Sequence, residues 1–469
     1  MGLVRYAIPG LLLLYFLARS TRQRIFLLGI PFLMYMGNSV FFENAKIFWI
    51  PGRLTPSDHV MLWLVITWVI YFDLFLPSFR RSGGRPLLFG PALSTPEEVV
   101  LVGMILLAAL QLVLTATRYG EIGAALTQAK GIAYLFAGYF LLRGMLCRAG
   151  RSDTLDFIKA FVLVNTLAAL LFVLHQGLHV PIYLATEYQT ITFMGQQITR
   201  SFYFMPQLLS LAIAYVFARR RWDILWFGVV LVTLAALWVS YTRSLLVIAV
   251  AELVVVFGVR LFKAQQAHLV ARRIVMLAAI VLVLGVFAYT LLPVQSQYFL
   301  SRIGMATSSG SVTGDPNLQN RIDKMKRVYG WIGLEGRYVG EGFTAPSQDA
   351  TVSSVELMSS DLVWVPVLFR FVLIGVALVV LLYAVMSWRA LRLSLSGDGD
   401  AEFLALVLLG VVVGMFLEGF VSWTFLNPVR YPLGLWVFAF VVAEACRRRA
   451  ELDEAPAPAE SRPVEAVHV

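Results

Sequence analysis

The sequence predicts an all-α, multi-pass membrane protein of about 12–13 membrane-spanning helices, and three observations predict it. Of its 469 residues, 59% are hydrophobic and 14% are charged, whereas a soluble domain carries about 25% charged residues. Apolar segments long enough to cross a bilayer recur along most of the chain. These segments are continuous, whereas the strands of a membrane barrel alternate apolar and polar residues, which favours helices.

The order of the apolar segments divides the chain into four parts. Residues 1–292 hold helices 1–10 with short loops, and residues 293–361 form one long loop with amphipathic helices. Residues 362–446 return to membrane-spanning helices, and residues 447–469 form a Pro-, Ala- and Glu-rich tail that we expect to be disordered. The candidate spans are residues 3–18, 24–42, 59–79, 99–117, 131–146, 155–178, 201–218, 222–240, 244–262, 274–292, 362–386, 403–421 and 431–446.

The distribution of positive charge predicts the orientation of these spans. Successive loops lie on opposite sides of the membrane, and most lysines and arginines fall in the loops of one side. They are Arg19, Arg22, Arg24, Arg80, Arg81, Arg85, Arg148, Arg151, Arg219, Arg220, Arg221, Arg260, Lys263, Arg272, Arg273, Arg389, Arg392, Arg447, Arg448 and Arg449. Loops rich in Lys and Arg stay in the cytoplasm, so the long loop 293–361 lies on the outer face. Because topology accounts for the net charge of +10, no nucleic-acid partner is needed to explain it.

The long loop contains a predicted amphipathic helix. Asp315 is a suitable N-cap and Pro316 a suitable first helical residue. An apolar stripe at helical spacing follows, consisting of Ile322, Met325, Tyr329 and Ile332, beside a basic stripe of Arg321, Lys324 and Arg327. We expect this helix to lie on the outer leaflet with its basic side towards lipid phosphates.

The residue type that recurs at the outer face is arginine. "VSYTRSLLVIA" places Arg243 between two spans, and Arg200 precedes another; Arg321, Arg327, Arg337, Arg370 and Arg430 lie on the same side. A guanidinium offers a planar fork of donors that matches phosphate oxygens. The alternative is that each arginine at a span end extends to lipid headgroups. No nucleotide-binding motif is present, and the five histidines are scattered, so we expect neither a metal nor a cofactor.

Outer carboxylates are the candidate general bases. Asp361 opens the span 362–386, where it is either a base for a sugar hydroxyl or simply the N-cap of that helix. Glu341 and Arg337 in the loop, with Glu418 near the outer end of its span, are candidates to bind an acceptor or shape a cavity. Charged residues inside spans, such as Glu418, usually face the interior of a helix bundle.

Four stretches in order, within about residues 195 to 440, resemble a known family. They are "RSFYFMPQLLSLAIAYVF" from Arg200, "YTRSLLVIAVAELVVV" around Arg243, "NRIDKMKRVYGWIGLEGRYVGEGF" in the long loop, and "SSDLVWVPVLFRFVLIGV" at the late span. Together they resemble the O-antigen ligase and Wzy-type O-antigen polymerase family. One departure is that the loop 293–361 has no histidine, and Ser360 and Asp361 stand where family ligases tend to carry one.

The resemblance implies a GT-C-like fold and a metal-independent, inverting glycosyltransferase of the bacterial inner membrane, with its active site facing the periplasm. Its substrate would be an undecaprenyl-pyrophosphate-linked oligosaccharide. Arg200 and Arg243 would bind the pyrophosphate, supported by Arg321 and Arg327, and Asp361 would act as base. The missing histidine favours a polymerase. The alternatives are a ligase that transfers glycan to lipid A core or protein, a lipid-linked sugar flippase, and a binding platform for a chain-length regulator.

Overall fold

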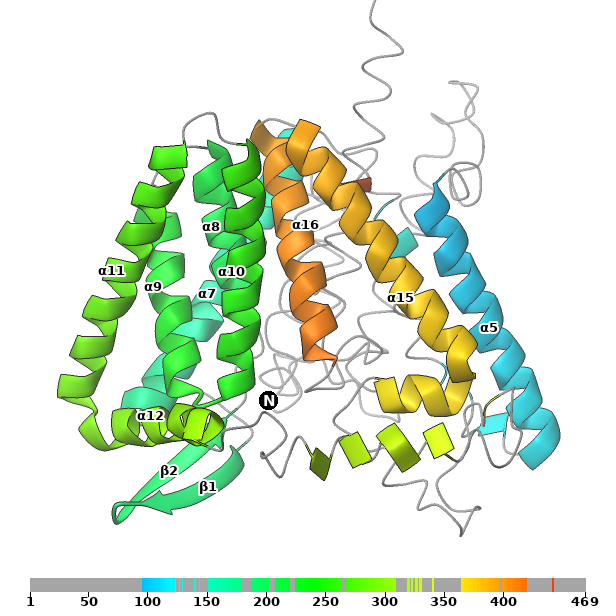
Figure 1. Ribbon diagram of the computed structural model, residues 1–469, viewed down its shortest axis with the longest axis horizontal. Coiled ribbons are helices and arrows are strands. Elements are labelled where there is room, and N and C mark those ends of the chain that lie inside the picture. Colours follow the sequence, from blue (N-terminus) through cyan, green and yellow to red (C-terminus); the bar gives the residue numbers. More distant parts are fainter. Residues whose placement is uncertain are drawn as a thin grey trace, which may run out of the picture.

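A computed structural model describes eight continuous stretches of the chain (Figure 1). They are residues 95–120, 151–178, 187–201, 207–219, 224–263, 267–308, 364–396 and 399–419. Single positions are described between them, at 122, 123, 126, 129, 139, 140, 143, 180, 319, 320, 322, 323, 325–327, 329, 330, 340, 441 and 442.

Long helices run alongside one another and make up most of the described chain. They are α5 (Pro96–Tyr119), α7 (Arg151–Leu178), α8 (Gln207–Arg219), α9 (Ile224–Val239), α10 (Arg243–Lys263), α11 (Ala267–Leu291), α15 (Trp364–Ser396) and α16 (Gly399–Glu418). Within the described residues, five of them, α5, α10, α11, α15 and α16, are long and apolar enough to cross a membrane. The protein is therefore a multi-pass, predominantly α-helical membrane protein, as the composition predicts.

Most described helices lie close to the expected spans, and three differ from them by six residues or more. Helix α11 begins at Ala267, seven residues earlier than expected. Helix α8 begins at Gln207, six residues later than expected, because residues 196–201 belong to a strand. Helix α15 continues to Ser396, ten residues beyond the expected end. The spans 3–18, 24–42 and 59–79 lie outside the described residues, and only single positions of 131–146 and 431–446 lie within them.

Helix α5 illustrates how local sequence sets helix ends. Pro96 occupies the first turn, where a missing N–H costs nothing, and Glu97 and Glu98 follow it at the positive end of the helix dipole. At the other end Gly120 adopts φ 70°, and its N–H donates to the carbonyl of Ala116. A left-handed residue after the last turn is the common way to end a helix.

The core of the bundle is centred on α16, the most deeply buried of the five long apolar helices. It packs against α8, α10 and α15. Gly410 allows the close approach of Ser210 from α8, whose Cβ would lie 3.4 Å from a Cβ added at that glycine. Gly414 similarly faces the buried Glu252 of α10. Small residues at such contacts let membrane helices approach closely.

One end of the bundle carries the basic residues, and we call it the basic end. Helices α8, α10 and α15 finish there, and α5, α9, α11 and α16 begin there (Figure 1). Glu402 of α16 forms ion pairs with Arg260 and, at 3.1 Å, with Lys263 of α10. A second pair joins Glu97 of α5 to Arg389 of α15. These contacts tie α10 to α16 and α5 to α15 at this end.

The opposite end carries short elements, and we call it the hairpin end. Strands β1 (Glu187–Phe193) and β2 (Gln196–Ser201) form an antiparallel hairpin, and helix α12 (Pro293–Ser308) lies across the bundle there (Figure 1). This hairpin is the strand structure of an otherwise helical set of described residues. The turn Met194–Gly195, with φ 49° and 76°, connects the strands directly, which is the geometry that two-residue hairpins favour.

Candidate functional site

An aromatic cluster at the hairpin end joins three separate elements. It consists of Ile198 from β2, Tyr241 from the α9–α10 junction, and Tyr298 and Phe299 from α12, all at most 4% exposed. The rings of Tyr241 and Tyr298 meet edge to face with centroids 5.8 Å apart. Trp238 packs on Phe299 with centroids 4.6 Å apart. Such contacts stabilise beyond area burial alone, so the hairpin and α12 are held on the bundle.

The junction between α9 and α10 is fixed by hydrogen bonds of its own. The hydroxyl of Ser240 donates to the carbonyl of Leu237 at 2.8 Å, and the hydroxyl of Thr242 donates to the carbonyl of Ser240 at 3.1 Å. Tyr241 between them adopts φ 52°, a region that costs an ordinary residue about 1–2 kcal/mol. Burial of its ring in the cluster compensates for that cost.

Burial also affects the ionisation of Tyr241. Desolvation, followed by the interaction with Tyr298, raises the pKa of the Tyr241 hydroxyl well above its ordinary range. The side chain is therefore neutral at every physiological pH. Its role at the junction is to pack and to position its neighbours, because it cannot serve as a base.

Arg243 and Arg200 both belong to backbone that this cluster holds. Arg243 is the first residue of α10, two positions after Tyr241, so it stands at the positive end of a helix dipole, which favours anions. Arg200 lies in β2, paired with Gln189, two positions after Ile198. Alternate residues of a strand share one face, so position 200 lies on the same face of the hairpin as Ile198.

A second structural feature of the hairpin end is a break in α15. Val372 has φ 54° and ψ −158° inside the helix, so residues 364–371 run across the bundle instead of along it (Figure 1). Gly340, with φ 77°, docks against this break. A Cβ added to Gly340 would lie 2.8 Å from the carbonyl carbon of Arg370 and 3.2 Å from the nitrogen of Phe371. The long loop therefore contacts α15 beside Arg370, whose side chain is buried.

The structure describes some of the remaining candidate residues and not others. Arg327 is exposed on a helical segment, where Ile322 and Met325 are partly buried and Tyr329, from the expected apolar stripe, is exposed. Glu418 is the last residue of α16, at the hairpin end. Arg321, Arg337, Glu341 and Asp361 lie outside the described residues. In the described part of the chain, no three of His, Cys, Asp and Glu gather into a metal site.

Sequence reasoning missed the residues that organise this end. No sequence pattern assigns a role to Tyr241, Tyr298 or Phe299, which the structure brings together. A signal for α12 was available, because Pro293 at its start is typical of a first helical turn. The hairpin also had a signal, the Thr–Ile–Thr–Phe run before Met194–Gly195.

The chain was also compared with known proteins. It matches no model of a known protein family, and no curated protein is detectably similar to it.

Proposed function

We propose that this protein is a membrane glycosyltransferase of the O-antigen ligase and polymerase type, and specifically a polysaccharide polymerase. It would act in a bacterial inner membrane, with the hairpin end facing the periplasm. Its substrates would be undecaprenyl-pyrophosphate-linked oligosaccharide repeat units, and it would need neither metal nor cofactor. Besides the resemblance in residues 195–440, one structural observation supports the proposal most.

That observation is the aromatic cluster of Ile198, Tyr241, Tyr298 and Phe299. It ties the strand that carries Arg200 to the turn that precedes Arg243. The cluster holds the backbone at both positions, and two arginines that converge there would form a preorganised cationic site, which stabilises charge without reorganisation during the reaction. A diphosphate leaving group is an anion that such a site fits.

The proposed reaction is an inverting displacement at the anomeric carbon of the donor glycan. A hydroxyl oxygen of the acceptor repeat unit forms the new bond to that carbon while its bond to the diphosphate oxygen breaks. The diphosphate departs with the electron pair, and Arg200 and Arg243 stabilise its growing charge. The hydroxyl proton passes to a carboxylate, for which Asp361 is the candidate, or to the departing diphosphate.

Replacement of Arg243 tests the assignment directly. Arg243→Ala should lower polymer yield at least about 100-fold, the loss typical when one preorganised charge donor is removed. The matched control is Arg392→Ala, since Arg392 is an exposed arginine at the basic end. Both variants should reach the membrane in normal amounts, as measured by immunoblot. Normal polymer length and yield from Arg243→Ala would contradict the assignment.

The glycan that accumulates in a deletion strain separates the proposed polymerase from the other classes. A polymerase deletion should accumulate single lipid-linked repeat units accessible from the periplasm. Long lipid-linked polymer would indicate a ligase instead, and repeat units confined to the cytoplasmic leaflet would indicate a flippase. Mass spectrometry of extracted lipids, with a membrane-impermeant enzyme to report the leaflet, distinguishes the three results.

A further inference from the structure

Three polar side-chain atoms at the hairpin end are buried and make no hydrogen bond to the described part of the chain. They are the hydroxyl oxygen of Tyr298 in α12, the indole nitrogen Nε1 of Trp238 in α9 and the amide oxygen of Gln207 in α8. Tyr298 is 4% exposed and Gln207 is 2% exposed. A buried polar group without a partner destabilises the fold, and folded proteins keep few of them. A group that is kept in spite of this cost is a candidate to bind a ligand.

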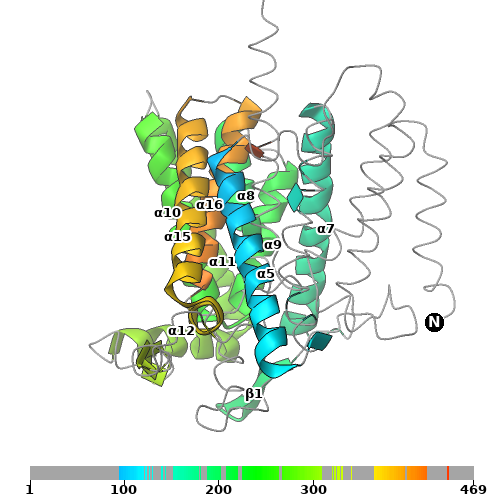
Figure 2. The same ribbon diagram turned by 90° about the vertical axis from the view of Figure 1, so that its right-hand side faces the viewer.

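The ring of Tyr298 is held by two elements of the candidate site. It meets the ring of Phe193 in β1 with centroids 5.3 Å apart and the ring of Tyr241 with centroids 5.8 Å apart, both edge to face. Helix α12 is itself anchored, because the hydroxyl of Ser296 donates to the carbonyl of Ala288 in α11 at 3.1 Å. Figure 2 shows that α12 and the hairpin lie at the same end of the bundle. The ring is therefore fixed in position before any ligand binds.

The hydroxyl of Tyr298 lies towards the α9–α10 junction. Burial raises the pKa of Tyr241, and the interaction with Tyr298 raises it further, so the two hydroxyl groups are close enough to interact. Tyr241 stands two positions before Arg243, which begins α10. The first N–H groups of a helix and its dipole both favour an anion. A buried hydroxyl near the start of α10 supplies one more hydrogen-bond donor for such an anion.

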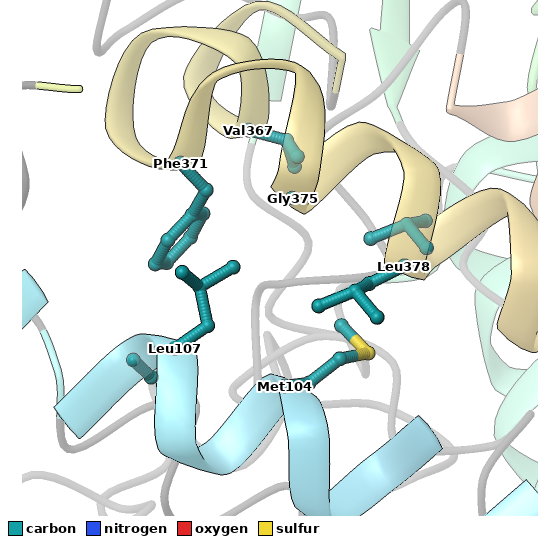
Figure 3. A pocket seen from close by; sticks show the side chains of 8 residues that line it. Met104, Leu107, Val367, Phe371, Gly375 and Leu378 are labelled. Carbon is teal, nitrogen blue, oxygen red and sulfur yellow. The ribbon is translucent and has the colours of Figure 1, made fainter. Parts of the chain in front are cut away.

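A small groove between α5 and α15 has a different character. Every residue that lines it is apolar, among them Phe371 and Leu378, whose side chains point into it (Figure 3). Phe371 also fills the space beside Gly375. The groove therefore offers no side-chain donor, whereas the hairpin end offers the hydroxyl of Tyr298 and the indole of Trp238.

The two donors at the hairpin end belong to one packed cluster and suit the same kind of ligand. Trp238 packs on Phe299, the neighbour of Tyr298, with ring centroids 4.6 Å apart. An indole N–H can only donate, and a tyrosine hydroxyl donates one hydrogen bond. Hydrogen bonds to an ionised acceptor are about twice as strong as those between neutral groups. An anion with several oxygens, such as a phosphate group, is therefore the ligand that satisfies these donors most effectively.

We propose that the hydroxyl of Tyr298 is a further binding group of the candidate site and donates a hydrogen bond to a phosphate oxygen of the ligand. The inference rests on the proposed function for the identity of that ligand, which carries a diphosphate. Tyr298 acts alongside Arg200 and Arg243 as a neutral donor held by packing, whereas the arginines supply charge. Ligand binding gives the buried hydroxyl the acceptor that it lacks among the described residues.

Titration of the purified full-length protein with inorganic pyrophosphate tests this inference without requiring turnover. Tyr298→Phe removes the hydroxyl and keeps the ring. Loss of a hydrogen bond to a charged group should weaken pyrophosphate binding at least about tenfold. The unfolding temperature without ligand should not fall, because the hydroxyl has no hydrogen-bond partner among the described residues. The matched control is Tyr215→Phe, which alters a tyrosine stacked on Trp226 away from the site and should leave pyrophosphate binding unchanged.

A double variant locates the effect. Arg243→Ala should itself weaken pyrophosphate binding, and the addition of Tyr298→Phe to that variant should lower the remaining affinity less than about twofold, because two groups that serve one bound anion are coupled. A full tenfold loss in the Arg243→Ala background would assign Tyr298 to a different site and overturn the inference.

Three further outcomes would overturn it. Unchanged pyrophosphate affinity in Tyr298→Phe would mean that the hydroxyl does not touch the anion. A lower unfolding temperature of this variant would mean that the hydroxyl has a structural partner. Absence of pyrophosphate binding by the unaltered protein would remove the anion site itself.

Polymer formation tests the proposed function separately. Polymer from a protein whose pyrophosphate affinity does not depend on Tyr298 would overturn this inference alone. Conversely, pyrophosphate binding that depends on Tyr298, in a protein that forms no polymer, would overturn the proposed function and leave the anion-binding role of Tyr298 in place.

Discussion

Tyr241 determines much of the structure at the α9–α10 junction. Its positive φ costs about 1–2 kcal/mol, whereas removing a buried aromatic ring costs about 3–5 kcal/mol. Packing therefore outweighs strain, and a tyrosine is retained where the backbone alone would favour glycine. Because Arg243 begins α10 two positions later, the packing of this ring also sets where α10 starts.

The raised pKa of Tyr241 predicts a pH effect on stability. A group whose pKa is higher in the folded protein contributes stability below its unfolded pKa of about 10 and loses it as the pH rises further. The free energy of unfolding should therefore be insensitive to Tyr241 from pH 6 to 9 and should fall above about pH 10. The free energy of unfolding of the Tyr241→Phe variant should fall less steeply above that pH. Equal slopes for both proteins above pH 10, measured by thermal unfolding in detergent, would contradict the burial of this hydroxyl.

At the residue scale, the sequence predicted which end of the molecule carries Arg200 and Arg243, because alternate spans cross the membrane in opposite directions. It did not predict what holds their backbone together. Tyr298 and Phe299 come from a distant part of the chain, and a contact between distant residues leaves no periodic signal in either segment. Aromatic residues near a span end are also common as membrane-interface anchors, so their packing role was not distinctive.

Among the elements, the break in α15 is contacted by Gly340 of the long loop. Gly340→Ala should disturb this contact, because the new methyl group would overlap the backbone at Arg370 and the positive φ disfavours alanine. We expect at least a tenfold loss of polymer yield and faster proteolysis of the loop 293–361. Gly330→Ala is the matched control, since nothing lies within 4 Å of the added methyl group. Unchanged yield and proteolysis for Gly340→Ala would show that docking at the break is not required.

Helices were more predictable from the sequence than the hairpin and the break. A long apolar run must be helical in a bilayer, because every backbone group needs a partner within the segment. The hairpin lies outside the apolar runs, where that constraint does not apply, and its short strands leave a weak alternation. The break at Val372 falls within an apolar run without a glycine or proline at that position, and the contact with Gly340 comes from a distant part of the chain, so the sequence pattern does not predict it.

For the whole molecule, the two ends differ in kind. The basic end is stabilised by ion pairs such as Arg260–Glu402, whereas the hairpin end is stabilised by aromatic packing and loop docking. The charge count predicts that the basic end faces the cytoplasm. The sequence predicts that the helical segment around Arg327 lies at the opposite end, but it does not identify the groove between α5 and α15, because a groove depends on which helices are neighbours.

Cysteine labelling tests this orientation. In a background without Cys147 and Cys446, Met194→Cys at the exposed hairpin tip should react with a membrane-impermeant maleimide added to spheroplasts. Arg392→Cys, exposed at the basic end, should react only after the membrane is permeabilised. The reverse pattern would place the hairpin end in the cytoplasm and contradict the proposed periplasmic site.

The most direct test of the proposed function is elongation by the purified protein in liposomes that contain undecaprenyl-pyrophosphate-linked repeat units. No nucleotide is added, and EDTA removes divalent metal ions. We expect a ladder of longer lipid-linked glycans, with one undecaprenyl pyrophosphate released for each transfer, and no ladder from Arg243→Ala. Failure of the folded protein to elongate these units, or elongation that depends on a metal ion or a nucleotide, would contradict the proposed function.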